Sequence, residues 1–143
     1  MRRRPASRDN ERVPPSLPED QVFAQIGEDG FRRLVAAFYR QIPADDILGP
    51  MYPKADLEGA ESRLRDFLIF RFGGPPTYIE RRGHPRLGMR HMPFPIDHAA
   101  SRRWIQLMDN AFTEAALPAE SEETLRAFFE HVATFLINRK EAQ

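Results

Sequence analysis

The sequence contains no cysteine, which excludes disulfide bonds and metal sites built on thiolates. This absence fits a cytoplasmic protein. The 21 Lys and Arg residues balance 21 Asp and Glu residues, so no excess charge favours binding to nucleic acid or to an anionic membrane. No apolar run approaches the ~20 residues of a membrane span, and none follows the basic start to make a secretory signal. We therefore expect a soluble, cytoplasmic protein that binds neither nucleic acid nor a membrane.

The chain of 143 residues suits a single domain. Its N-terminal segment, residues 1–19, carries five arginines and four prolines but almost no apolar side chain. Such a segment buries too little apolar surface to offset the loss of chain entropy on ordering. We therefore expect a flexible tail over 1–19 and one folded domain over 20–140.

Apolar residues recur at helical spacing in several segments, and no segment shows the sustained alternation of a β-strand. The clearest helical stripe follows a predicted short helix over 19–26 and a turn over 27–30, and it consists of Phe31, Leu34, Val35, Phe38, Tyr39 and Ile42. Pro43 ends that helix. Further helices are expected after Asp56, over 96–116 and after Ser121, with Asp56 and Ser121 as N-caps. The predicted fold class is all-α.

A long irregular segment, residues 75–95, separates two of the predicted helices and is rich in proline and glycine. Connections of this length are usually functional or disordered, and the anchoring side chains here favour an ordered one. His91 lies close in sequence to Met89, Met92 and Phe94. A histidine in apolar company is a candidate ligand for a metal or a metal-centred cofactor. The alternative is an ordinary surface or core histidine.

Helices around a flat apolar cavity suit haem, and the lack of cysteine excludes the covalent c-type attachment. His91 is then the candidate iron ligand. Oxygen bound to ferrous iron gains negative charge, so hydrogen-bond donors on the opposite side would retain it. Tyr39 and Trp104 are candidate donors, and Tyr52 is a third. The alternative is that these are core aromatics whose polar atoms meet backbone carbonyls.

Several short motifs, in order along the chain, strongly resemble the group II truncated haemoglobins. They are Phe38-Tyr39, Met51-Tyr52-Pro53, Leu57-Glu58-Gly59-Ala60-Glu61-Ser62-Arg63-Leu64, Gly73-Gly74-Pro75, Tyr78, Arg82-Gly83-His84-Pro85-Arg86-Leu87, Met89-Arg90-His91 and Trp104. The resemblance covers roughly residues 22 to 138 and leaves the N-terminal tail outside. One departure is Gly27-Glu28, which stands where the family often has two adjacent glycines.

The resemblance implies a globin-like, two-over-two α-helical sandwich that holds haem b non-covalently. In that pattern His91 matches the proximal iron ligand, and Tyr39, Tyr52 and Trp104 match the distal residues. Ala60 stands where longer globins place a distal histidine. The resemblance also implies further contacts with the cofactor. Those that would line the haem are Leu64, Phe67, Leu68, Met89 and Phe94, and Arg63 and Arg90 would meet its propionates. Tyr78 and His84 are two further contacts.

The function expected from this pattern is reversible binding of O2 at ferrous haem, with NO and CO as other diatomic ligands. One alternative is a redox enzyme that uses the same haem to oxidise nitric oxide with bound oxygen or to turn over peroxide. That alternative needs an electron donor from a redox partner, because the sequence has no flavin or nicotinamide motif. A helical interaction module without haem is a third reading. Whether the protein forms a homodimer is left open.

Overall fold

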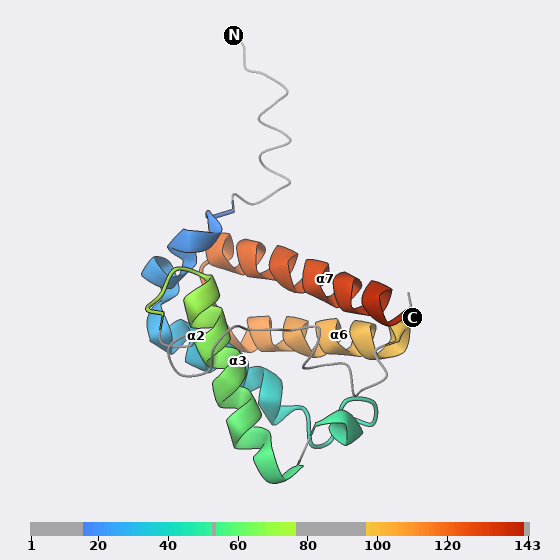
Figure 1. The fold of residues 1–143 in the computed structure, drawn as a ribbon. Coiled ribbons are helices and arrows are strands. Elements are labelled where there is room, and N and C mark those ends of the chain that lie inside the picture. Colours follow the sequence, from blue (N-terminus) through green and yellow to red (C-terminus); the bar gives the residue numbers. More distant parts are fainter. Residues whose placement is uncertain (1–15, 53, 77–96, 142–143) are drawn as a thin grey trace.

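The computed structural model describes residues 16–52, 54–76 and 97–141, and the regular elements within these ranges are all helical. They are three short 3-10 helices and four α-helices (Figure 1), in the order η1 (Glu19–Gln21), α2 (Val22–Arg40), η2 (Gly49–Met51), η3 (Lys54–Asp56), α3 (Leu57–Arg71), α6 (His98–Ala115) and α7 (Ala119–Glu141). The predicted all-α class is confirmed.

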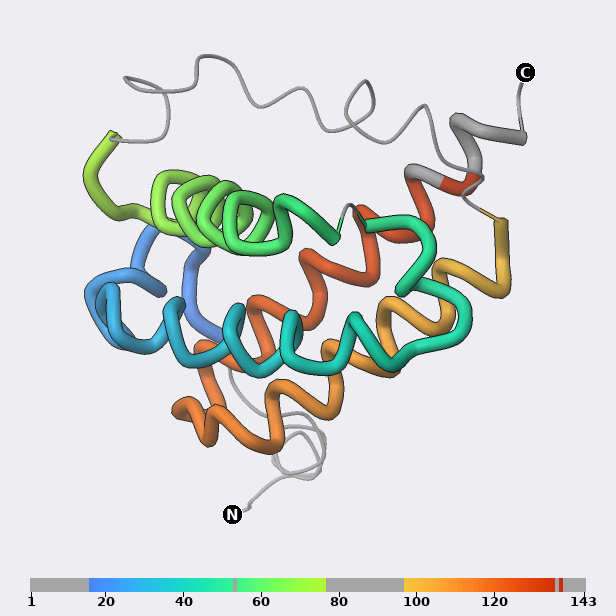
Figure 2. The backbone as a smooth tube through the Cα atoms, turned by 90° about the horizontal axis from the view of Figure 1, so that it is seen from below, coloured from blue at the N-terminus to red at the C-terminus, as the bar shows by residue number. Residues whose placement is uncertain are grey.

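The four α-helices form a two-over-two sandwich in which α2 pairs with α3 and α6 pairs with α7. Helices α6 and α7 run side by side in opposite directions (Figures 1 and 2). Helix α2 contacts each of the other three α-helices. It is therefore the central element of the fold, and the globin-like arrangement is confirmed.

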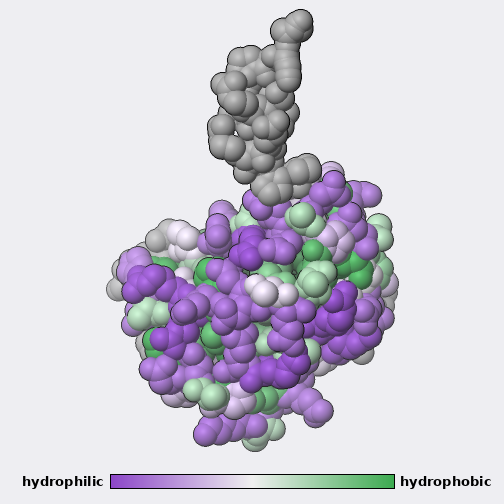
Figure 3. Space-filling view, turned by 180° about the vertical axis from the view of Figure 1, so that it is seen from behind, coloured by the Kyte–Doolittle hydropathy of each residue, from purple (hydrophilic) through white to green (hydrophobic). Residues whose placement is uncertain are grey.

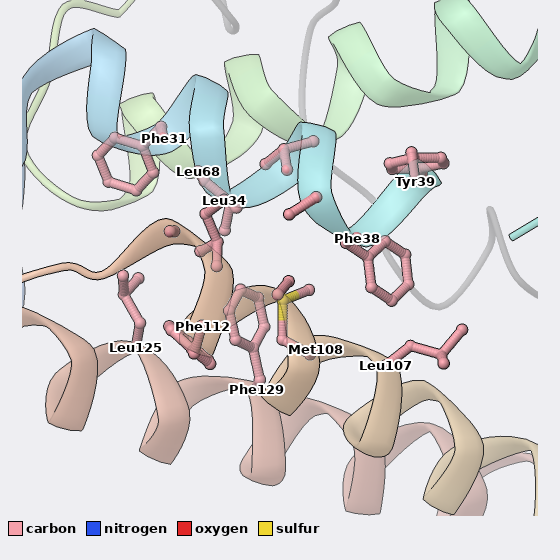
Figure 4. Packing of buried hydrophobic residues seen from close by; sticks show 14 of the residues in the cluster. Phe31, Leu34, Phe38, Tyr39, Leu68, Leu107, Met108, Phe112, Leu125 and Phe129 are labelled. Atoms are coloured by element: carbon pink, nitrogen blue, oxygen red, sulfur yellow. The ribbon is translucent and has the colours of Figure 1, made fainter. Parts of the chain in front are cut away.

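Helix α2 takes this position because its predicted apolar stripe is buried. The stripe residues with almost no exposed surface are Phe31, Leu34, Val35, Phe38 and Ile42. Figure 4 shows Phe31, Leu34 and Phe38 facing α6 and α7, where Met108 and Phe129 lie. Full burial of one such side chain contributes about 1.5–3 kcal/mol relative to leaving it exposed, so this stripe fixes α2 against both helices.

Gly27 divides α2 into two stretches at a kink. Its φ of 68° and ψ of −179° lie in a region that is essentially restricted to glycine. The helix resumes directly after Gly27, and Gly30 is already a buried helical residue. The predicted turn over 27–30 was therefore too long: one glycine is enough to redirect the chain.

One of the two predicted N-caps is wrong. Ser121 lies inside α7, which begins at Ala119, and its buried hydroxyl donates to the side-chain oxygen of Gln25 in α2. Asp56 is the N-cap residue of α3 as predicted, but its side chain accepts no capping hydrogen bond. Helix α6 has an N-cap that sequence analysis misses. The Asp97 side chain accepts a hydrogen bond from the backbone N–H of Ala100, in the first turn, at 2.8 Å.

The start of α2 is held against the end of α3. The backbone N–H of Phe23 donates to the Phe72 carbonyl at 2.9 Å. Gly73 has a φ of 100° and lies so close to Asp20 that an added Cβ would be 2.3 Å from the Asp20 carbonyl oxygen. The backbone of α3 can therefore turn here only with glycine at position 73.

Residues ahead of η1 contact α7. The Leu17 N–H donates to Thr124 Oγ1 at 2.9 Å, and that hydroxyl donates back to the Leu17 carbonyl at 2.6 Å. Residues 1–15 lie outside the described part of the chain. The flexibility expected of the N-terminal tail therefore stays a prediction.

The surface seen from behind is mainly hydrophilic, with apolar side chains scattered over it (Figure 3). Scattered apolar residues of this kind are normal on a folded domain. None of the helices that the structure describes combines the length and apolar character needed to cross a bilayer.

We predict that Gly73→Ala destabilises the protein more than Gly27→Ala does. At both positions a positive φ strains an alanine, which costs about 1–3 kcal/mol. At Gly73 the new Cβ also meets a backbone oxygen at 2.3 Å, whereas at Gly27 no atom lies within 4 Å. Urea unfolding of both variants and the parent measures the difference. Equal losses would mean that the end of α3 moves away from Asp20 without cost.

Candidate functional site

Three aromatic side chains that carry polar atoms meet between α2, α6 and the corner after η2. Tyr39 lies in the last turn of α2, Tyr52 directly follows η2, and Trp104 lies in α6. The Trp104 Nε1–H donates to the Tyr52 hydroxyl oxygen at 3.2 Å. The rings of Tyr39 and Tyr52 are nearly perpendicular, with centroids 5.6 Å apart. The structure thus brings together the three candidate donors predicted from the sequence.

Neighbouring aromatic rings hold the Trp104 indole in place. Its ring centroid lies 5.0 Å from that of Phe38 in α2 and 5.3 Å from that of Phe129 in α7. Both phenylalanines are buried, while Trp104 is half-buried. The indole therefore has a fixed hydrophobic support, and its N–H is directed at Tyr52.

Burial raises the pKa of both tyrosines. For Tyr39, burial is the largest cause, and the pKa rises far above its ordinary value. For Tyr52, burial raises the pKa to about 12, against the opposing effect of hydrogen bonds from Trp104 and Tyr39. The interaction between the two phenols raises the pKa of Tyr39 further and lowers that of Tyr52. Both phenols are neutral at physiological pH and keep their protons.

Helix α3 places apolar side chains beside these phenols. The charges of Glu61 and Arg63 act on Tyr39, so this part of α3 lies near its hydroxyl. The apolar residues of α3 that pack with the core include Leu57, Ala60, Leu64, Phe67 and Leu68. Phe67 and Leu68 are buried, whereas the other three are half-buried. Ala60 offers no polar atom on its side chain, so α3 contributes an apolar wall.

The described residues suit a flat apolar ligand with a polar reactive centre. Half-buried apolar side chains on α3 provide surface for such a ligand to cover. Neutral donors beside that wall can interact with a bound group that carries partial negative charge. This combination fits haem with a diatomic ligand.

Comparison with known proteins leads to the same interpretation. The family model described as bacterial-like globin matches residues 21–138. A curated relative, the group 2 truncated haemoglobin YjbI of Bacillus subtilis, is 35% identical over 121 residues, which cover 85% of this chain and 91% of that protein. A thermostable haemoglobin from Thermobifida fusca is 44% identical with a TM-score of 0.77, covering 81% of this chain and 95% of that one. Haemoglobin from Chloroflexus aurantiacus is 43% identical with a TM-score of 0.78, covering 85% of this chain and 98% of that one.

This chain is a group II truncated haemoglobin of the bacterial-like globin family. Membership of this family implies that the chain binds haem and, through it, diatomic gas ligands such as O2. The haem interpretation from the sequence is confirmed at this level, and the helical interaction module without haem is not supported.

Six of the predicted site residues of this truncated haemoglobin lie outside the described residues. They are Tyr78, His84, Met89, Arg90, His91 and Phe94. The assignments of His91 as iron ligand and of the other five as haem contacts therefore remain predictions from the sequence resemblance.

Arg63, the described candidate for a propionate contact, forms an ion pair with Asp56. The Arg63 Nη2 lies 3.0 Å from Asp56 Oδ2, and the two side chains are 35% and 54% exposed. Exposed pairs of this kind contribute only about 0–1 kcal/mol. The guanidinium group has five donors, so this pair leaves it able to bind a carboxylate as well.

Sequence analysis misses two charged residues at the margin of the site. Arg103 directly precedes Trp104, and its Nη1 lies 2.7 Å from Asp45 Oδ1. These residues are separated by 58 positions in the sequence. The only local signal in the sequence is an aspartate soon after Pro43, a composition that favours a turn, and it does not identify the partner of that aspartate.

We predict that the free energy of unfolding falls as the pH rises above about 10, the ordinary pKa of tyrosine. The unfolded chain loses its phenolic protons there, while folded Tyr39 and Tyr52 keep theirs to higher pH. The unfolded state then binds fewer protons than the folded state, so stability decreases with pH. Urea unfolding at pH about 9 and about 11 should show a smaller fall for Tyr52→Phe than for the parent. An identical fall in both would contradict the raised pKa of Tyr52.

Proposed function

We propose that this truncated haemoglobin binds O2 reversibly at the ferrous iron of a non-covalent haem b, with Tyr39, Tyr52 and Trp104 as distal hydrogen-bonding residues. The bound haem supplies the iron that holds the ligand. The observation that carries the proposal is the Trp104–Tyr52 hydrogen bond of 3.2 Å beside the apolar wall of α3. The absence of cysteine excludes thioether attachment of the haem.

Tyr52 is the residue best placed to donate to the bound ligand. Its hydroxyl oxygen accepts a hydrogen bond from the Trp104 indole. A phenol oxygen carries one proton and accepts through its lone pairs, so this bond leaves the Tyr52 O–H able to donate to a ligand. Accepting a bond polarises the hydroxyl and strengthens its own donation. Trp104 therefore supports Tyr52, and the Tyr39 ring lies beside it, with centroids 5.6 Å apart.

The apolar wall of α3 increases the effect of these donors. Leu64, Phe67 and Leu68 would contact the porphyrin, and the side chain of Ala60 adds no polar atom of its own. Where water is excluded, a hydrogen bond to a partially charged ligand is stronger than at a wet surface. His91 would ligate the iron, and Arg63 and Arg90 would meet the propionates.

Enzymatic use of the same pocket needs an electron donor. Oxidation of nitric oxide or turnover of peroxide would rely on the haem chemistry and on a redox partner. No contact among the described residues favours either reaction over reversible binding, so binding is the function proposed.

We predict that His91→Ala abolishes normal haem coordination, because a neutral imidazole is the expected protein ligand to the iron. Absorption spectra of the ferric, ferrous and oxygenated protein measure this. The matched control is His131→Ala, which removes an exposed histidine of α7 and should retain a stable oxygenated spectrum. Equal haem binding by the parent and His91→Ala would exclude His91 as the ligand.

We predict that Tyr52→Phe raises the O2 dissociation rate more than Tyr39→Phe or Trp104→Phe. A neutral hydrogen bond contributes about 0.5–1.5 kcal/mol net, so its loss corresponds to an increase of about two- to tenfold. Stopped-flow ligand replacement measures the rates. Dissociation of CO serves as the control, because bound CO carries less negative charge than bound O2. Unchanged O2 rates in all three variants would remove the distal hydrogen bonds from the explanation.

A further inference from the structure

Helix α6 contacts the corner segment, residues 45–52, through two successive residues. Trp104 donates to the Tyr52 hydroxyl at the end of this segment. Arg103 Nη1 donates to Asp45 Oδ1 at its beginning, at 2.7 Å, and to Asp46 Oδ1 at 2.8 Å. The corner is therefore attached to one turn of α6 at both of its ends.

Asp45 is the buried anchor of this attachment. Its side chain is 8% exposed, whereas that of Asp46 is 84% exposed. The second oxygen of Asp45 accepts from the backbone N–H of Leu48 at 2.7 Å and of Ile47 at 3.1 Å. One carboxylate thus binds the arginine and shapes the turn, while the pair with exposed Asp46 is screened by solvent.

Backbone hydrogen bonds continue from Asp45 to Tyr52. The Gly49 N–H donates to the Asp45 carbonyl at 3.0 Å, and the Tyr52 N–H donates to the Gly49 carbonyl at 3.3 Å. These bonds close a ring that leads from Arg103 through Asp45, Gly49 and Tyr52 to Trp104, the neighbour of Arg103 in α6. A shift at Asp45 therefore reaches the Tyr52 hydroxyl through a continuous set of contacts.

We propose that Arg103 and Asp45 are a positioning pair that sets the Tyr52 hydroxyl against the Trp104 indole and thereby slows ligand release. This inference rests on the proposed function only for its effect on release. The placement of Tyr52 against Trp104 is a property of the chain itself. Arg103 does not touch the ligand in this proposal; it acts through the corner segment.

The test compares Arg103→Gln with Arg126→Gln as a matched control. Arg126 also pairs with two carboxylates, those of Asp109 and Glu122, and its side chain is 30% exposed against 28% for Arg103. We expect Arg103→Gln to raise the O2 dissociation rate several-fold and Arg126→Gln to leave it unchanged. Both substitutions remove an arginine from two ion pairs, and Arg126→Gln also removes a guanidinium that lies 4.7 Å from the centre of the buried Phe112 ring. A general loss of stability would therefore affect the control as well.

A double-mutant cycle shows whether Arg103 acts through Tyr52. In a Tyr52→Phe background, Arg103→Gln should change the dissociation rate little, because the donor that it positions is gone. Arg103→Lys keeps the charge but loses the fixed fork of the guanidinium, so it should give a smaller increase than Arg103→Gln. Equal effects of Arg103→Gln with and without Tyr52 would overturn the proposal.

A second measurement is independent of ligand binding. Trp104 is the one tryptophan of the sequence, so its indole N–H gives a single assignable NMR signal. Arg103→Gln should move that signal and speed its exchange with solvent, and Arg126→Gln should not. An unchanged signal would overturn the positioning role. A changed signal without any change in O2 release would retain the positioning role and count against the proposed distal function. If Arg103→Gln does not fold, Arg103→Lys supports the same measurements.

Discussion

The proposed ligand site depends on one hydrogen bond, from the Trp104 indole N–H in α6 to the Tyr52 hydroxyl oxygen. The ring of Tyr39 in α2 lies against that of Tyr52, with centroids 5.6 Å apart. Burying a polar group without a partner costs about 1–3 kcal/mol, so this one bond satisfies two half-buried groups at once. The position of the Tyr52 oxygen therefore decides whether the indole is satisfied.

The packing of α2 makes this meeting point possible. Its buried stripe faces α6 and α7 (Figure 4). The ring of Phe38, in the last turn of α2 beside Tyr39, lies 5.0 Å from that of Trp104 in α6. The kink at Gly27 lets the helix begin against the end of α3 and still reach α6. Hydrophobic burial thus supplies the stability, and the hydrogen bonds specify how the polar atoms are arranged within it.

Helical periodicity predicted the main elements because burial imposes it directly on the sequence. The stripe from Phe31 to Ile42 is buried as expected. Local rules failed where a tertiary contact decided the outcome. Ser121 resembles an N-cap, yet its hydroxyl bonds to Gln25, which is 96 positions away. The turn predicted around Gly27 reduces to one residue, because packing of α2 against the other helices favours continuing the helix on both sides.

The candidate site could likewise be predicted only in part. The sequence motifs named Tyr39, Tyr52 and Trp104, and the structure brings these three side chains together. The segment that contains His91 lies outside the described residues. The pair of Arg103 and Asp45 has no signal of its own in the sequence, because neither residue shows which of the many opposite charges it meets. Only the three-dimensional course of the chain identifies that contact.

The bond between Trp104 and Tyr52 also determines how substitutions at this site combine. Removing Tyr52 takes away a donor and, with it, the acceptor of the Trp104 indole N–H. Removing Trp104 leaves Tyr52 in place with that acceptor position unfilled. The effects of these residues on a bound ligand are therefore not independent, and a sum of single substitutions counts the same contacts more than once. The three side chains are better understood as one polar unit, held in place by the apolar contacts of α2 and α6.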